Sequence, residues 1–399
     1  KTAADWYPWT QLGYTYDWGK TGPGLAGIEG LSEFILTKGT PAVDYSVLAL
    51  YSLQSYLYKG NTIGSGDFNV TANCDSIWAG TRFQGNGNSI VIAPGGRISG
   101  GEGIYVSSSG YTVINNGEIS GPTAQKYRYY TFGPQGRETH YAGPAGVSIY
   151  FENGGNVVNN ATGIMYGDGI AIGSNGTPAA ATNVINYGYL TGIQYAIKTG
   201  SQDDTLSVEN GGTVRGAVDL GSGNDSITFK GGSTYIPVID RLAGTVTTLK
   251  SKTINVNNGA IIAPEFSTSA LIQDGTVYRL ADTDTINGNF TTVENPSPVF
   301  DFATVLNTPN DSIDLIAHRV PYSQVAGNED YRLRGIGAAL DSALPTATGD
   351  MAAVLTNIDN ISTSEGVAAA TRQLSPMVYT INPQITFDNS RRLYDQVMQ

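Results

Sequence analysis

Hydrophobic positions repeat in short units over the middle of this chain. Ser89–Gly100 and Thr205–Gly216 share one pattern, in which apolar and polar residues alternate on either side of a turn that contains Gly-Gly. Thr112–Gly121 and Asn183–Gly192 share a second pattern, with Asn and Gly at the turn. Alternation with period two indicates strands that bury one face. Units of about 20–27 residues made of strands and turns are typical of a solenoid.

The repeats predict an all-β fold, a right-handed parallel β-helix. One coil cannot bury its own apolar face, so stability must come from the stacking of each coil on its neighbours. The inward-facing residues of successive coils should then form one continuous core column. We expect four residues from different coils in this column: Ile90, Ile114, Ile185 and Leu206.

Glycine and asparagine recur at the corners between strands. Both residues suit tight turns, and glycine also adopts positive φ without strain. Gly188 lies at such a corner, where a larger side chain should strain the turn. Three asparagines occupy the same corner in different units, Asn115, Asn159 and Asn186, and we expect their side chains to hydrogen-bond to one another as a ladder.

The pattern divides the chain into three regions. Residues 1–84 contain all four tryptophans, and we interpret them as an aromatic-rich cap with the first coils. Such a cap would cover the open edge of the solenoid. Residues 85–325 are predicted to form the β-helix, with an inserted loop at 122–144 and less regular strands after 232. Residues 326–399 change to a helical period.

The helical region has recognisable start signals. Ile336, Leu340 and Leu344 lie four residues apart, as on one helix face. Asp350 is expected to cap a helix over Met351–Leu355. Ser362–Glu365 has the spacing of a capping box. Pro383 is placed to open a last helix.

The insertion at 122–144 is the main candidate for recognition. It is basic and aromatic in an otherwise acidic chain, and Tyr and Arg are enriched in binding hot spots. An insertion between coils must leave the stack, and such loops often carry binding residues. The alternative is an irregular loop that only packs on the solenoid. The candidate binding residues are Lys126, Tyr127, Arg128, Tyr129, Tyr130, Arg137, His140 and Tyr141.

Composition limits the classes of partner. The formal net charge is −12 and the pI about 4.6, which does not favour nucleic acid or an anionic membrane as a partner. No apolar run has the length of a membrane-spanning helix. Cys74 is the only cysteine, so no disulfide forms within the chain, and we interpret it as a small buried hydrophobe.

The ordered set of motifs resembles the passenger of a bacterial autotransporter, a type V secretion protein, with the helical linker that precedes its translocator barrel. The repeat Thr112–Gly121 and the longer segment Asp204–Phe229 resemble the coils of such passengers. The helical end resembles the linker in the order of four short motifs, Gly337–Leu340, Gly349–Asp350, Gln373–Pro376 and Phe387–Arg392.

This resemblance implies export across the outer membrane and a location at the bacterial cell surface or outside the cell. It implies a translocator barrel as a partner in cis, whose strands should follow Gln399. A non-enzymatic role in adhesion, self-association or assembly of a surface layer is then expected. The partner would be a glycan or protein of a host, a neighbouring cell or the surface matrix.

Two chemical alternatives concern the acidic corners. Parallel β-helices also occur in enzymes that cleave extracellular polysaccharides, and paired carboxyl groups suit glycoside cleavage. The candidate catalytic residues of that alternative are Asp203, Asp204, Asp219 and Asp225, which otherwise only cap turns. Gly221–Phe229 also resembles a calcium-binding nonapeptide, but calcium rolls need such units in tandem. We therefore predict no metal and no cofactor.

Overall fold

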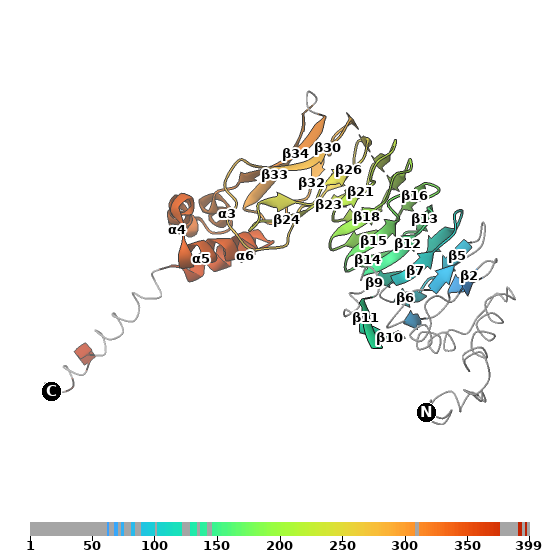
Figure 1. Cartoon of the computed structure of the whole chain (residues 1–399). Helices are drawn as coiled ribbons and strands as arrows, with labels where there is room; N and C mark the ends of the chain where they lie inside the picture. Colours follow the sequence, from blue (N-terminus) through green and yellow to red (C-terminus); the bar gives the residue numbers. More distant parts are fainter. Residues whose placement is uncertain are drawn as a thin grey trace.

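The computed structural model describes residues 89–99, 102–121, 146–307 and 311–375, with short strands within 62–83, two paired strands at 128–133 and 136–141, and residues 390–392 and 396. Its strands stack as successive coils along a curved body, and helices follow at the C-terminal end (Figure 1). The predicted parallel β-helix is confirmed. The four tryptophans of the predicted N-terminal cap lie outside the described residues.

Three long sheets run along the solenoid, and each coil contributes one strand to each sheet. Sheet A has the order β1 (Thr62–Ile63), β4 (Thr81–Phe83), β7 (Glu102–Val106), β12 (Val147–Phe151), β15 (Ile170–Ser174), β18 (Tyr195–Lys198), β21 (Val218–Asp219), β26 (Leu249–Lys250), β30 (Thr276–Asp282), β34 (Ser312–Arg319) and β33 (Phe300–Asn307). Sheet B has the order β2 (Phe68–Val70), β5 (Ser89–Ile92), β8 (Thr112–Asn115), β13 (Gly155–Asn159), β16 (Thr182–Asn186), β19 (Thr205–Val208), β22 (Ser226–Phe229), β27 (Thr253–Val256) and β31 (Thr285–Asn287). Sheet C has the order β3 (Asn73–Asp75), β6 (Arg97–Ser99), β9 (Glu118–Gly121), β14 (Ile164–Gly167), β17 (Tyr189–Gly192), β20 (Thr213–Arg215), β23 (Thr234–Ile236), β28 (Ile261–Ile262) and β32 (Thr292–Val293).

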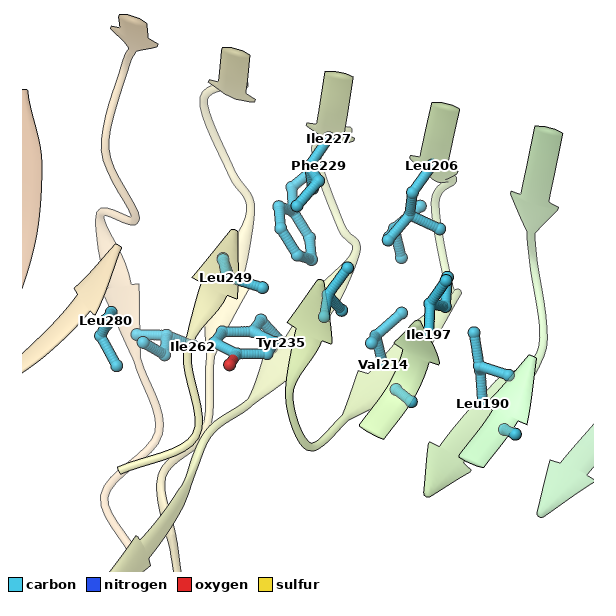
Figure 2. Close-up of a cluster of buried hydrophobic side chains, with 14 of the residues drawn as sticks. Leu190, Ile197, Leu206, Val214, Ile227, Phe229, Tyr235, Leu249, Ile262 and Leu280 are labelled. Atoms are coloured by element: carbon cyan, nitrogen blue, oxygen red, sulfur yellow. The ribbon is translucent and has the colours of Figure 1, made fainter. Parts of the chain in front are cut away.

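The core is a column of apolar side chains supplied in turn by the three sheets (Figure 2). In one coil, Ile197 comes from sheet A, Leu206 from sheet B and Val214 from sheet C, and all three are buried. The next coil places Ile227 in register with Leu206 and Tyr235 in register with Val214. Parallel pairing keeps each inward residue against its counterpart in the next coil, which makes the core continuous.

One part of the core prediction was wrong. Ile90 and Leu206 are buried as expected, but Ile114 is only partly buried and Ile185 is 39% exposed. Both lie on the outer side of sheet B, because the inward positions of their strands are taken by a valine and by the corner asparagine. Alternation permits two phases, and a one-residue change of phase exchanges the buried and exposed sets.

The predicted asparagine ladder is confirmed. Asn115 Nδ2 donates to Asn159 Oδ1 over 2.8 Å, and Asn159 Nδ2 donates to Asn186 Oδ1 over 2.7 Å. All three side chains are completely buried. At the C-terminal end of the ladder, Asn186 Nδ2 donates to the Thr213 carbonyl oxygen over 2.9 Å. The ladder therefore places polar groups inside the solenoid with their hydrogen bonds formed, as buried amides require.

Gly188 is required by close approach and not by its backbone angle. Its φ is not positive, but a Cβ would lie 2.2 Å from the Gly163 carbonyl oxygen and 2.4 Å from that of Asn160. We expect Gly188→Ala to lower the free energy of unfolding by about 1–3 kcal/mol, since the backbone of the adjacent coil must move. Urea denaturation measures this. Gly176→Ala is the matched control, with no atom within 4 Å of its Cβ; equal losses in both variants would contradict the explanation.

The insertion at 122–144 contains regular structure that the sequence analysis did not predict. β10 (Arg128–Gly133) and β11 (Gly136–Tyr141) form an antiparallel hairpin and a separate two-stranded sheet. A further small sheet lies near the C-terminal coils and contains β24 (Val238–Asp240), β25 (Thr245–Val246) and β29 (Glu265–Phe266). The hairpin thus leaves the three long sheets, as an insertion between coils must.

The C-terminal end of the solenoid is closed by antiparallel strands and helices. β34 pairs antiparallel with both β30 and β33, which ends the parallel addition of coils. Within the residues described up to 375, four α-helices and two short 3₁₀ helices follow, in the order α3 (Tyr322–Glu329), η4 (Tyr331–Leu333), α4 (Arg334–Ala343), η5 (Leu344–Thr346), α5 (Gly349–Asp359) and α6 (Ser364–Gln373). We call residues 300–373 the C-terminal cap. It covers the sheet edge that would otherwise stay unpaired.

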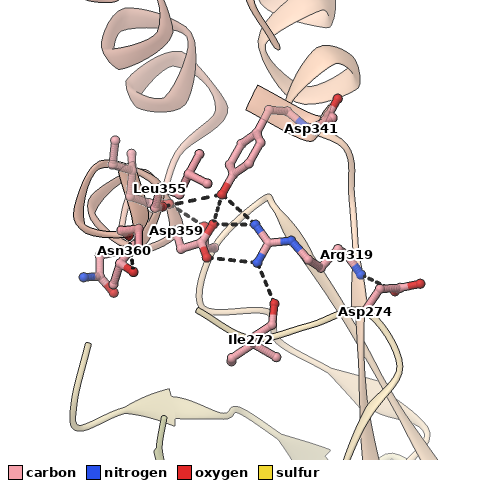
Figure 3. A network of polar contacts seen from close by, with 12 residues as sticks. Ile272, Asp274, Arg319, Asp341, Leu355, Asp359 and Asn360 are labelled. Atoms are coloured by element: carbon pink, nitrogen blue, oxygen red, sulfur yellow. Dashed lines mark hydrogen bonds and ion pairs between the residues drawn. The ribbon is translucent and has the colours of Figure 1, made fainter. Parts of the chain in front are cut away.

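A buried ion pair joins the strands of the cap to its helices (Figure 3). Arg319, the last residue of β34, binds both carboxylate oxygens of Asp359 on α5, over 2.7 and 2.9 Å. The Tyr322 hydroxyl donates to Asp359 Oδ1 over 2.6 Å, and Arg319 also donates to the Ile272 carbonyl oxygen. Side-chain exposure is 6% for Arg319 and 0% for Asp359. The bidentate geometry fixes α5 against the last coils.

The helix predictions hold in outline and err at the ends. The helix over Met351–Leu355 is part of α5, whose N-cap is Thr348 and not Asp350, and Leu340 is buried on α4 as expected. The predicted boundary at 325/326 falls within α3. The first N–H groups of this helix, those of Tyr322 and Ser323, donate to Asp341 of α4. The N-cap of α6 is Thr363 and not Ser362. The helix predicted from Pro383 lies mainly outside the described residues.

Candidate functional site

The acidic corners form a ladder in which each buried carboxylate binds the backbone of the preceding coil. Asp225 Oδ1 accepts a hydrogen bond from the N–H of Asp204 over 2.9 Å. Asp204 Oδ1 accepts in the same way from the N–H of Thr182 over 2.5 Å. Asp204 and Asp225 are 0% and 1% exposed. These two carboxylates hold three successive coils together at the corner between sheets A and B.

The other two candidate carboxylates, Asp203 and Asp219, also accept hydrogen bonds from nearby backbone N–H groups. Asp203 Oδ1 accepts from the N–H of Asn224 over 2.7 Å, and this contact and the Asn224 amide lower the pKa of Asp203. Asp219 Oδ1 accepts from the N–H of Gly221 over 3.0 Å and lies 3.4 Å from Lys250 Nζ. The structure therefore brings the predicted residues onto consecutive coils, as expected, and ties them to turns and neighbouring coils.

This placement gives the polysaccharide-cleaving alternative no support. A glycosidase needs two carboxyl groups that reach the substrate on either side of one bond, whereas Asp204 and Asp225 are buried. The calcium alternative gains no support either, since the Asp225 carboxylate in the nonapeptide-like segment binds a backbone N–H. Within the described part of the chain, no group of three or more His, Cys, Asp or Glu side chains is arranged to hold a metal ion.

Burial of the acidic ladder predicts a pH dependence of stability. Desolvation raises the pKa values of Asp204 and Asp225 above 3.8, despite the backbone hydrogen bonds that oppose it. A raised pKa in the folded state gives stability that is complete below pH 3.8 and is lost as the pH rises through the raised value. We expect Asp204→Asn, whose amide oxygen still accepts from Thr182, to match the wild type near pH 3.8 and to exceed its stability at neutral pH.

Urea denaturation of both proteins from about pH 3 to about pH 7 measures this difference. Comparing the two proteins removes the contribution of other carboxyl groups, such as Glu265, whose pKa is lowered by the hydrogen bonds from Arg215. A variant that is less stable than the wild type at neutral pH, and equal to it in acid, would mean that the charged carboxylate stabilises this corner.

Six of the eight candidate binding residues of the insertion lie on the strands of the hairpin. Arg128 pairs with Tyr141 and Tyr129 with His140, while Tyr130 and Arg137 lie further along the two strands. Lys126 and Tyr127 lie outside the described residues. The hairpin thus brings two ends of the basic, aromatic insertion together, which its sequence alone did not indicate.

A groove between the last coils and α5 offers little chemistry. Its volume is about 430 Å³. None of its lining side chains is titratable, and general acid–base catalysis needs such a group. The lining residues are Ser269, Ala270, Leu271, Gln273, Ala347, Ala352, Ala353, Thr356 and Asn357.

A surface that the sequence analysis missed is the outer side of sheet B. Val158 and Ile185 occupy neighbouring outward positions there, although Ile185 was predicted to lie in the core. The signal that identifies their direction is the asparagine that follows each of them. Once the corner asparagine is known to point inward, period two requires the preceding residue to point outward.

The chain therefore belongs to the class of parallel β-solenoids, and its C-terminal cap consists of strands and helices. No protein-family model, curated protein or solved structure matches this chain. In the described segments, none of the helices has both the length and the apolar character needed to span a membrane.

Proposed function

We propose that this chain is the passenger of a bacterial type V secretion system, displayed on the cell surface or released from it. It acts without catalysis, in adhesion, self-association or assembly of a surface layer. The observation that supports this proposal most is the order of the fold, in which stacked coils end in a cap of strands and helices joined by Arg319 and Asp359. Passengers of this class have the same order of coils and helices before the barrel.

A folded cap that follows the coils can help the coils to fold during export. A chain that leaves a pore C-terminal end first needs a folded platform on which the next coil can stack. β34 of the cap pairs with β30 of the last coil, and the preceding coil adds to β30 and β31 through its own strands β26 and β27. Such addition needs few long-range contacts, which favours rapid folding. Once folded, the long faces of the solenoid can make many weak contacts at the same time, as a displayed adhesin requires.

Export can be tested by placing the chain in front of a translocator barrel in a Gram-negative host. We expect the chain to reach the surface, where external protease degrades an unfolded control passenger but leaves the coils intact. Asp359→Ala is the matched variant, because it weakens only the junction inside the cap; we expect more protease-sensitive passenger at the surface. Retention of the wild-type chain in the periplasm, beside a control passenger that is exported, would overturn the secretion proposal.

Catalysis is tested separately on the purified chain. We expect no release of reducing ends from acidic polysaccharides. Release by the wild type and not by Asp204→Asn would replace the adhesin role with the enzyme alternative.

The hairpin is the proposed recognition element for a glycan or protein partner. Cells displaying the chain with and without residues 124–141 can be compared for binding to host cells, to neighbouring bacteria and to matrix components. We expect the deletion to reduce binding, since it removes the basic and aromatic residues of the insertion. Unchanged binding would exclude the hairpin from recognition.

A further inference from the structure

The outer face of sheet B carries no charged residue from β5 to β31. Sixteen outward positions on eight strands are occupied by Ser, Thr, Asn, Val or Ile. They form two rows along the solenoid. One row is Ser89, Thr112, Asn156, Asn183, Thr205, Ser226, Thr253 and Thr285, and the other is Val91, Ile114, Val158, Ile185, Ser207, Thr228, Asn255 and Asn287.

The other two long faces are charged. The outer side of sheet A carries Lys198, Asp219 and Lys250 in register on neighbouring strands. On sheet C, Arg97 pairs with Glu118, and Arg215 binds Glu265 through two hydrogen bonds. The outer face of sheet B therefore differs from the other two long faces in lacking charged residues, in a chain with a net charge of −12.

The N-terminal half of the second row is an apolar stripe. It consists of Val91, Ile114, Val158 and Ile185, which are in register on four adjacent strands. The polar row beside the stripe is held by its own side-chain hydrogen bonds, since Asn183 donates to Asn156 and accepts from Thr205. A flat apolar stripe flanked by fixed polar groups resembles the core and rim of a protein interface.

We propose that the outer face of sheet B is the surface through which two copies of this chain associate. Two copies of an acidic protein repel one another, and faces that carry charges add specific like-charge contacts to that repulsion. Sheet B is the long face on which two copies can meet without such contacts. A two-fold axis through the apolar stripe places the stripe of one copy against that of the other, because such an interface is self-complementary.

The size of this face predicts weak pairing. Eight strands about 4.8 Å apart, with four residues of about 3.3 Å each, give about 500 Å² per copy. A stable dimer buries about 800 Å² per partner. Association is therefore weak in dilute solution and becomes strong where many copies are displayed together. This inference gives the proposed role in self-association a defined surface, but it does not depend on how the chain is exported.

The test uses the purified full chain in sedimentation velocity runs over a series of concentrations up to about 1 mM, the range in which weak pairing is visible. The stripe variant carries Val158→Glu and Ile185→Glu. The matched control carries Ile164→Glu and Tyr189→Glu, which add the same charge to outward positions in register on two neighbouring strands of sheet C. We expect the stripe variant to associate at least about tenfold more weakly than the wild type, and the control to stay within about twofold.

Salt provides an independent readout. Screening reduces the repulsion between acidic copies, so raising the ionic strength from about 0.01 M to about 0.15 M should strengthen association through an uncharged face. Association through the basic hairpin and an acidic surface would instead weaken with salt. The proposal is overturned if the wild type stays monomeric throughout, if both double variants lose association equally, or if salt weakens the pairing.

Thermal unfolding checks that each variant is folded before its association is interpreted. If the stripe double variant does not fold, Ile185→Asn replaces it, since asparagine already occupies positions 255 and 287 of the same row. This variant should weaken association by about threefold or more, because it removes one apolar side chain from the stripe. Unchanged association of folded Ile185→Asn would also overturn the proposal. Export of the displayed chain is measured separately, so failure here leaves the secretion proposal intact.

Discussion

Replacement of Asp359 by alanine should lower the free energy of unfolding by about 3–5 kcal/mol. The change leaves the Arg319 guanidinium buried without its carboxylate partner, and Arg319 is only 6% exposed. It also removes the acceptor of the Tyr322 hydroxyl. A buried charge that loses its partner cannot recover its solvation, which is why the loss exceeds that of an ordinary hydrogen bond. Urea denaturation gives the global value.

Hydrogen exchange should show that the loss is local to the cap. We expect α3 and α5 to lose protection before the coils do, because Asp359 joins α5 to β34 through Arg319 and to α3 through Tyr322. Arg279→Met is the control: its carboxylate partner Asp314 lies 2.6 Å away, also on β34, but the Arg279 side chain is 46% exposed. An exposed pair of this kind contributes less than about 1 kcal/mol. Similar losses for Asp359→Ala and Arg279→Met would contradict the role given to burial.

Asn159→Ala is expected to lower the free energy of unfolding by about 3 kcal/mol, since it leaves buried polar groups unpaired. Asn159 is the middle member of the ladder and contacts both of the others. It also donates to the carbonyl oxygens of Gly163 and Tyr189, over 3.2 and 3.3 Å. Its removal therefore interrupts the contact between three coils at one corner. Urea denaturation and thermal unfolding measure the effect.

Asn183→Ala is the appropriate comparison. Asn183 also makes side-chain hydrogen bonds between strands, but it lies on the outer face of sheet B, where water can replace them. A surface change of this kind should alter stability by no more than about 0.5 kcal/mol. If the two substitutions had equal effects, burial of the ladder would not explain the stability of the corner.

These two predictions concern different parts of the proposed function. The ladder stabilises the body of the solenoid, whose faces we propose as contact surfaces. The ion pair stabilises the cap, on which we propose that the coils stack during export. A variant of Asn159 should therefore weaken the middle coils without loosening the cap, whereas a variant of Asp359 should do the opposite. Limited proteolysis of the two variants can separate these outcomes by the positions of the first cuts.

The local pattern of residues was sufficient to predict the class of fold and the hydrogen bonds between the corner asparagines. Period-two alternation fixed the presence of strands, and the repeated corner asparagines predicted a ladder that Asn115, Asn159 and Asn186 form. Recurrence of the units implied stacking, since a single coil cannot bury its apolar side. The shift to helical spacing near Leu340 identified the helical end, although the bounds differ by a few residues because caps depend on partners such as Asp341.

Tertiary structure determined the phase of the alternation and the roles of the corner residues. Ile114 and Ile185 have the pattern of core residues, yet they point outward, because the inward position belongs to an asparagine that hydrogen-bonds to its counterparts in adjacent coils. Asp204 and Asp225 lie on consecutive coils, where two carboxyl groups could have acted as a catalytic pair, yet each binds an N–H of another coil. Partners of this kind lie 21 to 44 residues away along the chain, a separation of one coil, which the insertion lengthens between Asn115 and Asn159. No local window of sequence therefore contains both members of the contact.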